Sequence, residues 1–318
     1  MRPFKHINAT TIDEAVTALG GSNAWAFSGG TDVLGMLRAE ALSKDMYPET
    51  LVNLKTIPGL DYIKEEGGML KIGALTLLED IAINSTVHDN YTALAEAAHK
   101  TASPHIREMG TIGGNICQLN RCWYFRKPNN RFDCVRKGGG MCYATAGDNR
   151  YHSIYGGVMA CLAVNPSDTA PALVALDAKI VTSARTINAE DFWSAENGIK
   201  STVLDDDEIV TEIQVPTPAA GVKSAFIKLA IRRSIDFPIV NCAAAIGGGA
   251  AKICLNAVFN NPYRPTAAEE AIAGQTINEA NAEAACATCG SGAMALSMNK
   301  YKIQMAKGAV KKAILACK

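Results

Sequence analysis

The sequence has no excess of charge of either sign. Lys and Arg total 31, as do Asp and Glu, so the formal net charge is +0. Proteins that bind nucleic acid or an anionic membrane surface through their overall charge carry a clear positive excess. We therefore expect neither partner.

Long apolar segments are also absent. The longest runs, such as residues 242–246, are far too short to span a bilayer. The first residues show neither the basic start nor the apolar core of a secretion signal. The sequence thus predicts a cytoplasmic protein without a membrane span.

Histidine is scarce, with only five in the chain. None stands in an H-E-x-x-H or H-x-x-E-H pattern, which would indicate a catalytic metal site. No Ser/His/Asp arrangement is evident. We expect no hydrolytic chemistry and assign no catalytic side chain.

Strand and helix patterns fill most of the chain, which has 318 residues and ordinary globular composition. Turn signals divide it into three units, residues 1–58, 59–216 and 217–318. Capping boxes at residues 11–14, 76–79 and 266–269 predict helix starts. The expected strands are 4–7, 25–27, 51–54, 70–72, 179–182, 209–215, 225–229, 240–247 and 253–258, with regular structure also at 162–165. The expected helices include 33–41, 91–100, 169–176, 279–287 and 300–316.

Glycine occurs in two pairs with similar surroundings, at residues 28–32 (SGGTD) and 111–115 (TIGGN). Glycine lets backbone N–H groups approach a diphosphate closely, although one pair alone is more typical of a tight turn. Neither a G-x-G-x-x-G nor a P-loop pattern occurs. Together, the two pairs predict loops that clamp an extended dinucleotide between neighbouring units.

Five segments form a recognisable series: residues 26–34 (AFSGGTDVL), 102–115 (ASPHIREMGTIGGN), 165–169 (NPSDT), 226–236 (FIKLAIRRSID) and 257–269 (AVFNNPYRPTAAE). In this order they resemble the FAD-binding subunits of the molybdenum hydroxylase family, which includes xanthine dehydrogenases, aldehyde oxidoreductases and carbon monoxide dehydrogenases. The resemblance implies an α+β protein. Its first part would be a para-cresol methylhydroxylase-type FAD-binding fold of two α/β subdomains, and its last a C-terminal α/β domain of the CO dehydrogenase flavoprotein type.

FAD would lie between the first two subdomains, according to this resemblance. The FAD-binding residues that it implies are Ser28, Gly29, Gly30, Thr31, Asp32, Thr111, Gly113, Gly114, Asn115, Asp168 and Lys228.

Cysteine is concentrated in one segment: five of the ten lie between Cys117 and Cys161. In a reducing compartment such a cluster suggests metal ligation or redox work rather than disulfides. The segment contains no C-x-x-C pair, so spacing alone names no metal, and a surface loop with free thiols is the simpler alternative. A long loop without periodicity nevertheless needs a function or an internal brace.

The same segment resembles the [4Fe-4S]-containing branch of the family, which includes the 4-hydroxybenzoyl-CoA reductase β subunit. That branch has Arg-Cys, two central cysteines and then Cys-Leu-Ala before the Ser-Asp element. The cluster ligands it implies are Cys122, Cys134, Cys142 and Cys161. We expect Cys117 to pack near the flavin, and Cys286 and Cys289 to be core or surface thiols. Because both glycine pairs precede Cys122, FAD should survive the loss of most single ligands, with Cys161 the exception because it lies close to Asp168.

Six basic residues and one acid occupy residues 121–137. A solvated loop face is one interpretation, and a rim that tunes a cluster and docks an acidic electron carrier is the other. The basic residues are Arg121, Arg126, Lys127, Arg131, Arg136 and Lys137.

A multi-subunit oxidoreductase is what the resemblance implies. A large partner subunit would bind molybdopterin and a small one would bind [2Fe-2S] clusters. This chain would relay electrons between those clusters and an external carrier such as ferredoxin. The alternatives are a stand-alone flavin oxidase, for which few residues remain after Pro218, and a flavoprotein whose cysteine segment holds structural zinc.

Overall fold

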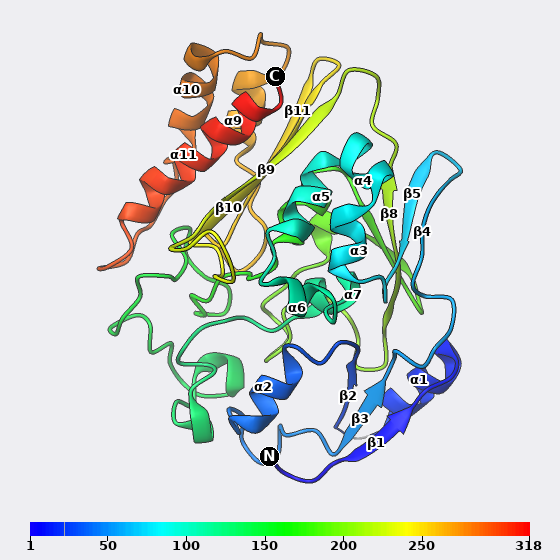
Figure 1. Ribbon diagram of the computed structural model, residues 1–318. Helices are drawn as coiled ribbons and strands as arrows, with labels where there is room; N and C mark the ends of the chain where they lie inside the picture. The colour runs from blue at the N-terminus through cyan, green and yellow to red at the C-terminus, as the bar shows by residue number, and fades with distance from the viewer. Residues whose placement is uncertain (22) are drawn as a thin grey trace.

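The N-terminal unit of the computed structural model, which describes residues 1–21 and 23–318, is a small parallel sheet in the order β1-β3-β2. Its strands are β1 (Lys5–Asn8), β2 (Ala24–Phe27) and β3 (Thr50–Asn53). Helix α1 (Ile12–Leu19) supplies the crossover that parallel pairing requires. Helix α2 (Val33–Arg38) follows the first glycine pair, at the bottom of Figure 1.

The middle unit is a five-stranded antiparallel sheet with helices packed on it. The strand order is β4 (Ile63–Glu66), β5 (Met69–Gly73), β8 (Val210–Pro216), β6 (Lys179–Thr182) and β7 (Thr186–Asn188). Apolar side chains of β5, β6 and β8 share one core with the helices. The helices are α3 (Leu78–Ile83), α4 (Ser85–Asn90), α5 (Thr92–His99), α7 (Ile112–Cys117) and α8 (Thr169–Ala175), and α6 (Pro104–Arg107) precedes α7.

The C-terminal unit is an antiparallel sheet covered on both faces. Its strands are β9 (Lys223–Leu229), β10 (Val240–Gly247) and β11 (Ala250–Asn256). Along β10, Cys242 and Ala244 face a core shared with α9 (Thr266–Ile272), α10 (Glu279–Thr288) and α11 (Tyr301–Ala316), whereas Ala243 faces the core of the middle unit. This two-residue alternation places the sheet between the two sets of helices, as Figure 1 shows.

The segment between α7 and α8 is irregular, apart from two 3-10 turns, η1 (Pro128–Asn130) and η2 (Val135–Lys137). It contains residues 118–168, and the regular structure predicted at 162–165 is wrong. A third 3-10 turn, η3 (Ala189–Asp191), follows β7. Among the described residues, no helix has the length and apolar character needed to cross a membrane.

Most predicted strands and helices are confirmed, but two of the three capping boxes are wrong. Thr11 does cap α1, accepting a hydrogen bond from the backbone N–H of Glu14. Thr76 instead donates to the carbonyl of Tyr62. Glu269 accepts from the backbone of Ile253 and pairs with Arg264. In both cases a distant partner displaced the local one. The unit boundaries at 58 and 216 stay predictions.

Candidate functional site

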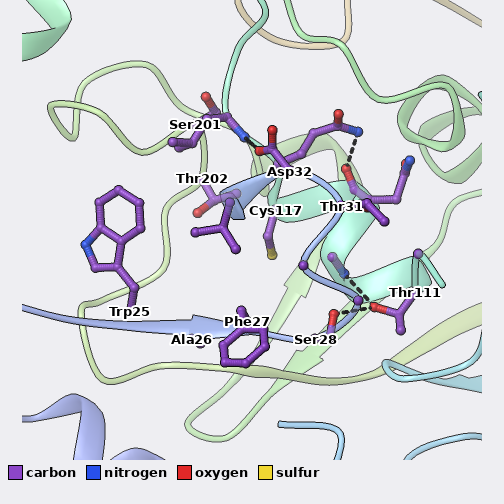
Figure 2. A pocket seen from close by; sticks show the side chains of 18 of the residues that line it. Trp25, Ala26, Phe27, Ser28, Thr31, Asp32, Thr111, Cys117, Ser201 and Thr202 are labelled. Atoms are coloured by element: carbon purple, nitrogen blue, oxygen red, sulfur yellow. Dashed lines mark hydrogen bonds between the residues drawn. The ribbon is translucent and has the colours of Figure 1, made fainter. Parts of the chain in front are cut away.

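A cleft of about 910 Å³ lies where the three units meet. The first glycine loop and β2 form one side, and the α6–α7 region forms another. Residues 197–208 and the β9–β10 turn at 235–237 complete the lining. Figure 2 shows Ser28, Thr31, Cys117, Ser201 and Thr202 around this cavity, with Trp25 extending from β2.

Both Gly29 and Gly30 of the first glycine loop occupy positions that require glycine. A Cβ on Gly29 would lie 2.0 Å from the backbone oxygen of Met109, so only glycine lets the two units touch there. Gly30 has φ +71°, in the left-handed region that glycine adopts at little cost. Within the described chain, no group accepts a hydrogen bond from the backbone N–H of Gly29, Gly30 or Thr31. These donors line the cleft and suit an anionic group.

The second glycine pair differs from our expectation, because it lies in the first turn of α7 rather than in a loop. Thr111 is the N-cap and accepts from the backbone N–H of Gly114 (3.1 Å). The Thr111 hydroxyl also lies 2.8 Å from that of Ser28 and so joins the two glycine pairs (Figure 2). Gly114 lines the cleft, but Gly113 does not, since a Cβ there would meet the carbonyl of Ala74 at 2.9 Å.

Asp168 lines the cleft, and Lys228 supports it from behind. Lys228 Nζ donates to Asp168 Oδ2 (2.7 Å) and to the carbonyl of Lys100 (2.8 Å), while Asn241 Nδ2 donates to Asp168 Oδ1 (2.8 Å). Burial raises the pKa of Asp168, and the charge and hydrogen bonds of Lys228 and Asn241 oppose that rise. Asn115 also lines the cleft and accepts from the hydroxyls of Ser167 (2.6 Å) and Thr169 (2.7 Å).

Asp32 has a role that the sequence did not indicate. Its carboxylate accepts from the backbone N–H of Leu119 (3.0 Å) and forms ion pairs with Arg121 (3.0 Å) and Arg126 (2.7 Å). The carboxylate therefore anchors the start of the cysteine segment to the first glycine loop. Its partners lie 87 or more positions away, so no local signal marks them.

Several lining residues were missed because they belong to irregular segments. Residues 197–206 form one wall, and no strand or helix pattern marks them. On the far side, the Arg121 guanidinium lies over the Phe237 ring, 4.4 Å from its centroid. Cys117 lines the cleft, and burial raises the pKa of its thiol to about 12.

The four cysteines expected to bind a cluster line a second, separate cavity, which we call the thiol cavity. It contains Cys122, Cys134, Cys142 and Cys161 and has an open volume of only about 10 Å³. Any group larger than a water would require these side chains to turn outward. Among the described residues, no three His, Cys, Asp or Glu side chains are arranged to hold a metal ion. All ten cysteines are free, and Cys286 and Cys289 lie in the C-terminal core.

Nitrogen groups surround the thiols. His152 Nε2 lies 3.2 Å from Cys122 Sγ, and the backbone N–H of Ala163 donates to Cys161 Sγ at 3.5 Å. Asn120 lines the cavity, and its buried Nδ2 has no acceptor within the part of the chain that is described. Burial raises the pKa of Cys122 to about 12, opposed by backbone N–H groups of Phe125 and Tyr124. Four thiols among nitrogen donors match the chemistry of an anionic iron–sulfur cluster.

The basic residues of the segment mostly point inward, which corrects the predicted six-residue rim. Arg121 and Arg126 pair with Asp32. Arg136 and Lys137 are buried and donate to backbone carbonyls. Lys127 and Arg131 are the two that are exposed.

Two family models cover nearly the whole chain. The model described as "FAD binding domain in molybdopterin dehydrogenase" matches residues 2–218. The model described as "CO dehydrogenase flavoprotein C-terminal domain" matches residues 225–317.

Known proteins align over the same span. The Escherichia coli (strain K12) aldehyde oxidoreductase FAD-binding subunit PaoB is 30% identical over 96% of this chain and 94% of its own. The carbon monoxide dehydrogenase medium chain of Hydrogenophaga pseudoflava is 28% identical, over 98% and 96%. A solved structure of carbon monoxide dehydrogenase from that organism superposes with a TM-score of 0.75 at 27% identity, covering 100% of this chain and 98% of that one. The comparisons do not single out the 4-hydroxybenzoyl-CoA reductase branch.

Proposed function

Since this chain belongs to the family of FAD-binding subunits of molybdenum-dependent dehydrogenases, and is thus an oxidoreductase subunit, we propose that its cleft holds FAD between the first glycine loop and α7. The observation that carries this proposal is the convergence of both glycine pairs on one cleft of about 910 Å³.

The roles follow from the contacts. The unpaired backbone N–H groups of Gly29, Gly30 and Thr31 would bind the diphosphate. The hydrogen bond between Ser28 and Thr111 would keep the two sides of the cleft at a fixed separation. Bound FAD supplies the electron-transfer chemistry, and the chain supplies binding, orientation and electrostatics.

A [4Fe-4S] cluster bound by Cys122, Cys134, Cys142 and Cys161 is the second part of the proposal. Its support is the shared thiol cavity and the nitrogen donors around it. In a [4Fe-4S] cluster each cysteine sulfur binds a different iron, so the four cysteine sulfurs lie further apart than they do around a single metal ion. A cluster site therefore need not resemble a site for one ion.

Closeness of the two cavities favours an electron relay. Along residues 118–122 the chain alternates between them: Gln118, Leu119 and Arg121 line the cleft, whereas Asn120 and Cys122 line the thiol cavity. A single thickness of polypeptide would therefore separate a flavin from a cluster.

The partners proposed are a molybdopterin-binding large subunit and a [2Fe-2S] small subunit. The support is that the similar proteins are themselves named as subunits or medium chains. We further propose that a ferredoxin-like acidic carrier docks at Lys127 and Arg131, the exposed cations of residues 121–137. The concentration of free cysteines suits the reducing cytoplasm.

Replacement of Gly114 by Val tests the cleft. A Cβ at Gly114 would lie 3.0 Å from the Ser28 hydroxyl and 3.1 Å from that of Thr111, so the larger side chain should separate the two glycine pairs. Extracted FAD per chain should fall sharply. Gly35→Val in α2 is the control, because a Cβ there meets nothing within 4 Å. Equal FAD in both variants would refute this cleft as the site.

A further inference from the structure

We propose that Arg136 is a positioning residue that holds one wall of the FAD cleft from within the cysteine segment, so that the order of that segment and the affinity for FAD are coupled. The inference rests on the proposed FAD site. It does not require that the thiol cavity hold a cluster.

The side chain of Arg136 is almost completely enclosed, with 4% of the residue exposed. Its Nε donates to the carbonyl of Gly198, and its Nη2 donates to the carbonyls of Ile199 (3.2 Å) and Lys200. The Ser201 hydroxyl lies 3.5 Å from the same Nη2. One guanidinium thus binds three consecutive carbonyls, which no other side chain could do with the same rigid set of donors.

The residues that Arg136 holds are the cleft wall itself. Asn197, Ile199, Lys200, Ser201 and Thr202 all line the cleft. Figure 2 shows Ser201, Thr202 and Cys117 among the residues that line that cavity. The wall is irregular, with a backbone hydrogen bond from Ser194 to Ser201 and another from Val203 to Phe192 near its ends. Without the guanidinium, buried carbonyls would lose their donors, which favours movement of the wall toward water.

The other end of the guanidinium reaches the thiol cavity. Arg136 Nη1 lies 3.9 Å from Cys161 Sγ, and Arg136 itself lines that cavity. A single side chain therefore contacts the wall of one cavity and a thiol that lines the other. Anything that orders the cysteine segment also orders the cleft wall, and by linkage FAD binding must stabilise the cysteine segment.

This coupling differs from an expectation based on chain order. Because both glycine pairs precede Cys122, the sequence predicted that FAD survives the loss of most single cysteine ligands, with Cys161 the exception. Arg136, together with the ion pairs of Asp32, makes that segment part of the cleft.

The test compares Arg136→Met with Arg131→Met, each in the full-length protein from which FAD has been removed. Arg131 is an exposed arginine of the same segment and serves as the control. FAD affinity is measured by fluorescence titration. The Arg136 variant should bind about tenfold more weakly, as expected for lost buried hydrogen bonds, and the control should be unchanged. Arg136→Lys should resemble Arg136→Met, because an ammonium presents its donors from a single point and lacks the planar fork of the guanidinium that reaches the carbonyls of Gly198, Ile199 and Lys200. Full affinity in Arg136→Lys would mean that charge, not geometry, matters and would overturn the proposal.

A measurement on the unmodified protein covers a variant that fails to fold. Hydrogen exchange is followed with and without FAD. FAD should slow exchange at residues 197–203, and also at 134–138, which line no part of the cleft. Protection at 197–203 without protection at 134–138 would overturn the coupling while leaving the FAD site intact. Absence of FAD binding in the wild type would instead refute the proposed function.

Discussion

The glycines of the two Gly-Gly pairs meet two structural needs, which are close backbone packing and access to the cleft. Gly29 and Gly113 are needed because backbone lies against them, at Met109 and Ala74 respectively. Gly29, Gly30 and Gly114 line the cleft, whereas Gly113 does not. The sequence predicted that both pairs matter, but it could not assign these roles, since the backbone in contact with each glycine belongs to another part of the chain.

The sequence also did not indicate which groups the charged residues of the site contact. Asp32, Asp168 and Lys228 were all predicted to bind FAD. Asp168 and Lys228 form a buried pair, and Asp32 binds the cysteine segment. A resemblance identifies such positions, but only the folded chain shows which side chain touches which.

Lys228→Met tests the buried pair. The change leaves Asp168 without its cation, and loss of one partner of a buried pair costs about 3–5 kcal/mol of unfolding free energy. Burial already raises the pKa of Asp168, and loss of Lys228 removes an opposing effect. A carboxyl whose folded pKa exceeds its unfolded value loses stability as pH rises through the folded pKa.

The loss of unfolding free energy in Lys228→Met should therefore be larger at neutral pH than near pH ~4, which is the pKa of Asp in an unfolded chain. Chemical unfolding at several pH values measures it. Lys311→Met, which removes a half-buried surface cation paired with the exposed Glu279 and Glu283, should change little at any pH. A pH-independent deficit in the Lys228 variant would contradict the assignment.

Elements with a strong period were predictable, and elements defined by tertiary contacts were not. β6 and β10 have the predicted bounds, because alternating or continuous apolar residues mark them. The capping boxes at residues 76 and 266 failed because Tyr62 and Ile253 offered better partners. The cleft wall at 197–206 has no strand or helix period, so this wall of the site could not be predicted.

The most specific prediction from the sequence concerns the cysteine segment. Ser in place of Cys122, Cys134, Cys142 or Cys161 should lower iron and acid-labile sulfide, because a [4Fe-4S] cluster takes four thiolates. Cys117→Ser should leave both unchanged, since Cys117 lines the cleft instead. Iron and sulfide quantitation with low-temperature EPR, on anaerobic protein, measures the effect. Cluster loss in Cys117→Ser with retention in Cys122→Ser would show that the first ligand is wrong.

At the scale of the whole molecule, all three units contribute residues to the cleft. A ligand held there stabilises the folded chain as a whole, because it binds no unfolded form. Lys127 and Arg131 form a small exposed cationic surface on the cysteine segment, where we have proposed that an external carrier docks.

Salt dependence of turnover by the assembled enzyme tests that surface. Exposed charges are screened over about 8–10 Å at moderate ionic strength, so turnover with ferredoxin should fall as salt rises. Turnover with a neutral dye should change little. Replacing Lys127 and Arg131 by Gln should flatten the ferredoxin dependence. Equal salt sensitivity with both acceptors would refute docking at these residues.

The visible spectrum of the anaerobically purified protein tests the central claim most directly. An FAD- and cluster-binding subunit should show the two flavin bands on a broad iron–sulfur absorbance, and reduction should bleach both. Flavin bands alone would leave the FAD site standing and remove the cluster. A spectrum without flavin bands, from protein that also fails to bind added FAD, would contradict the account.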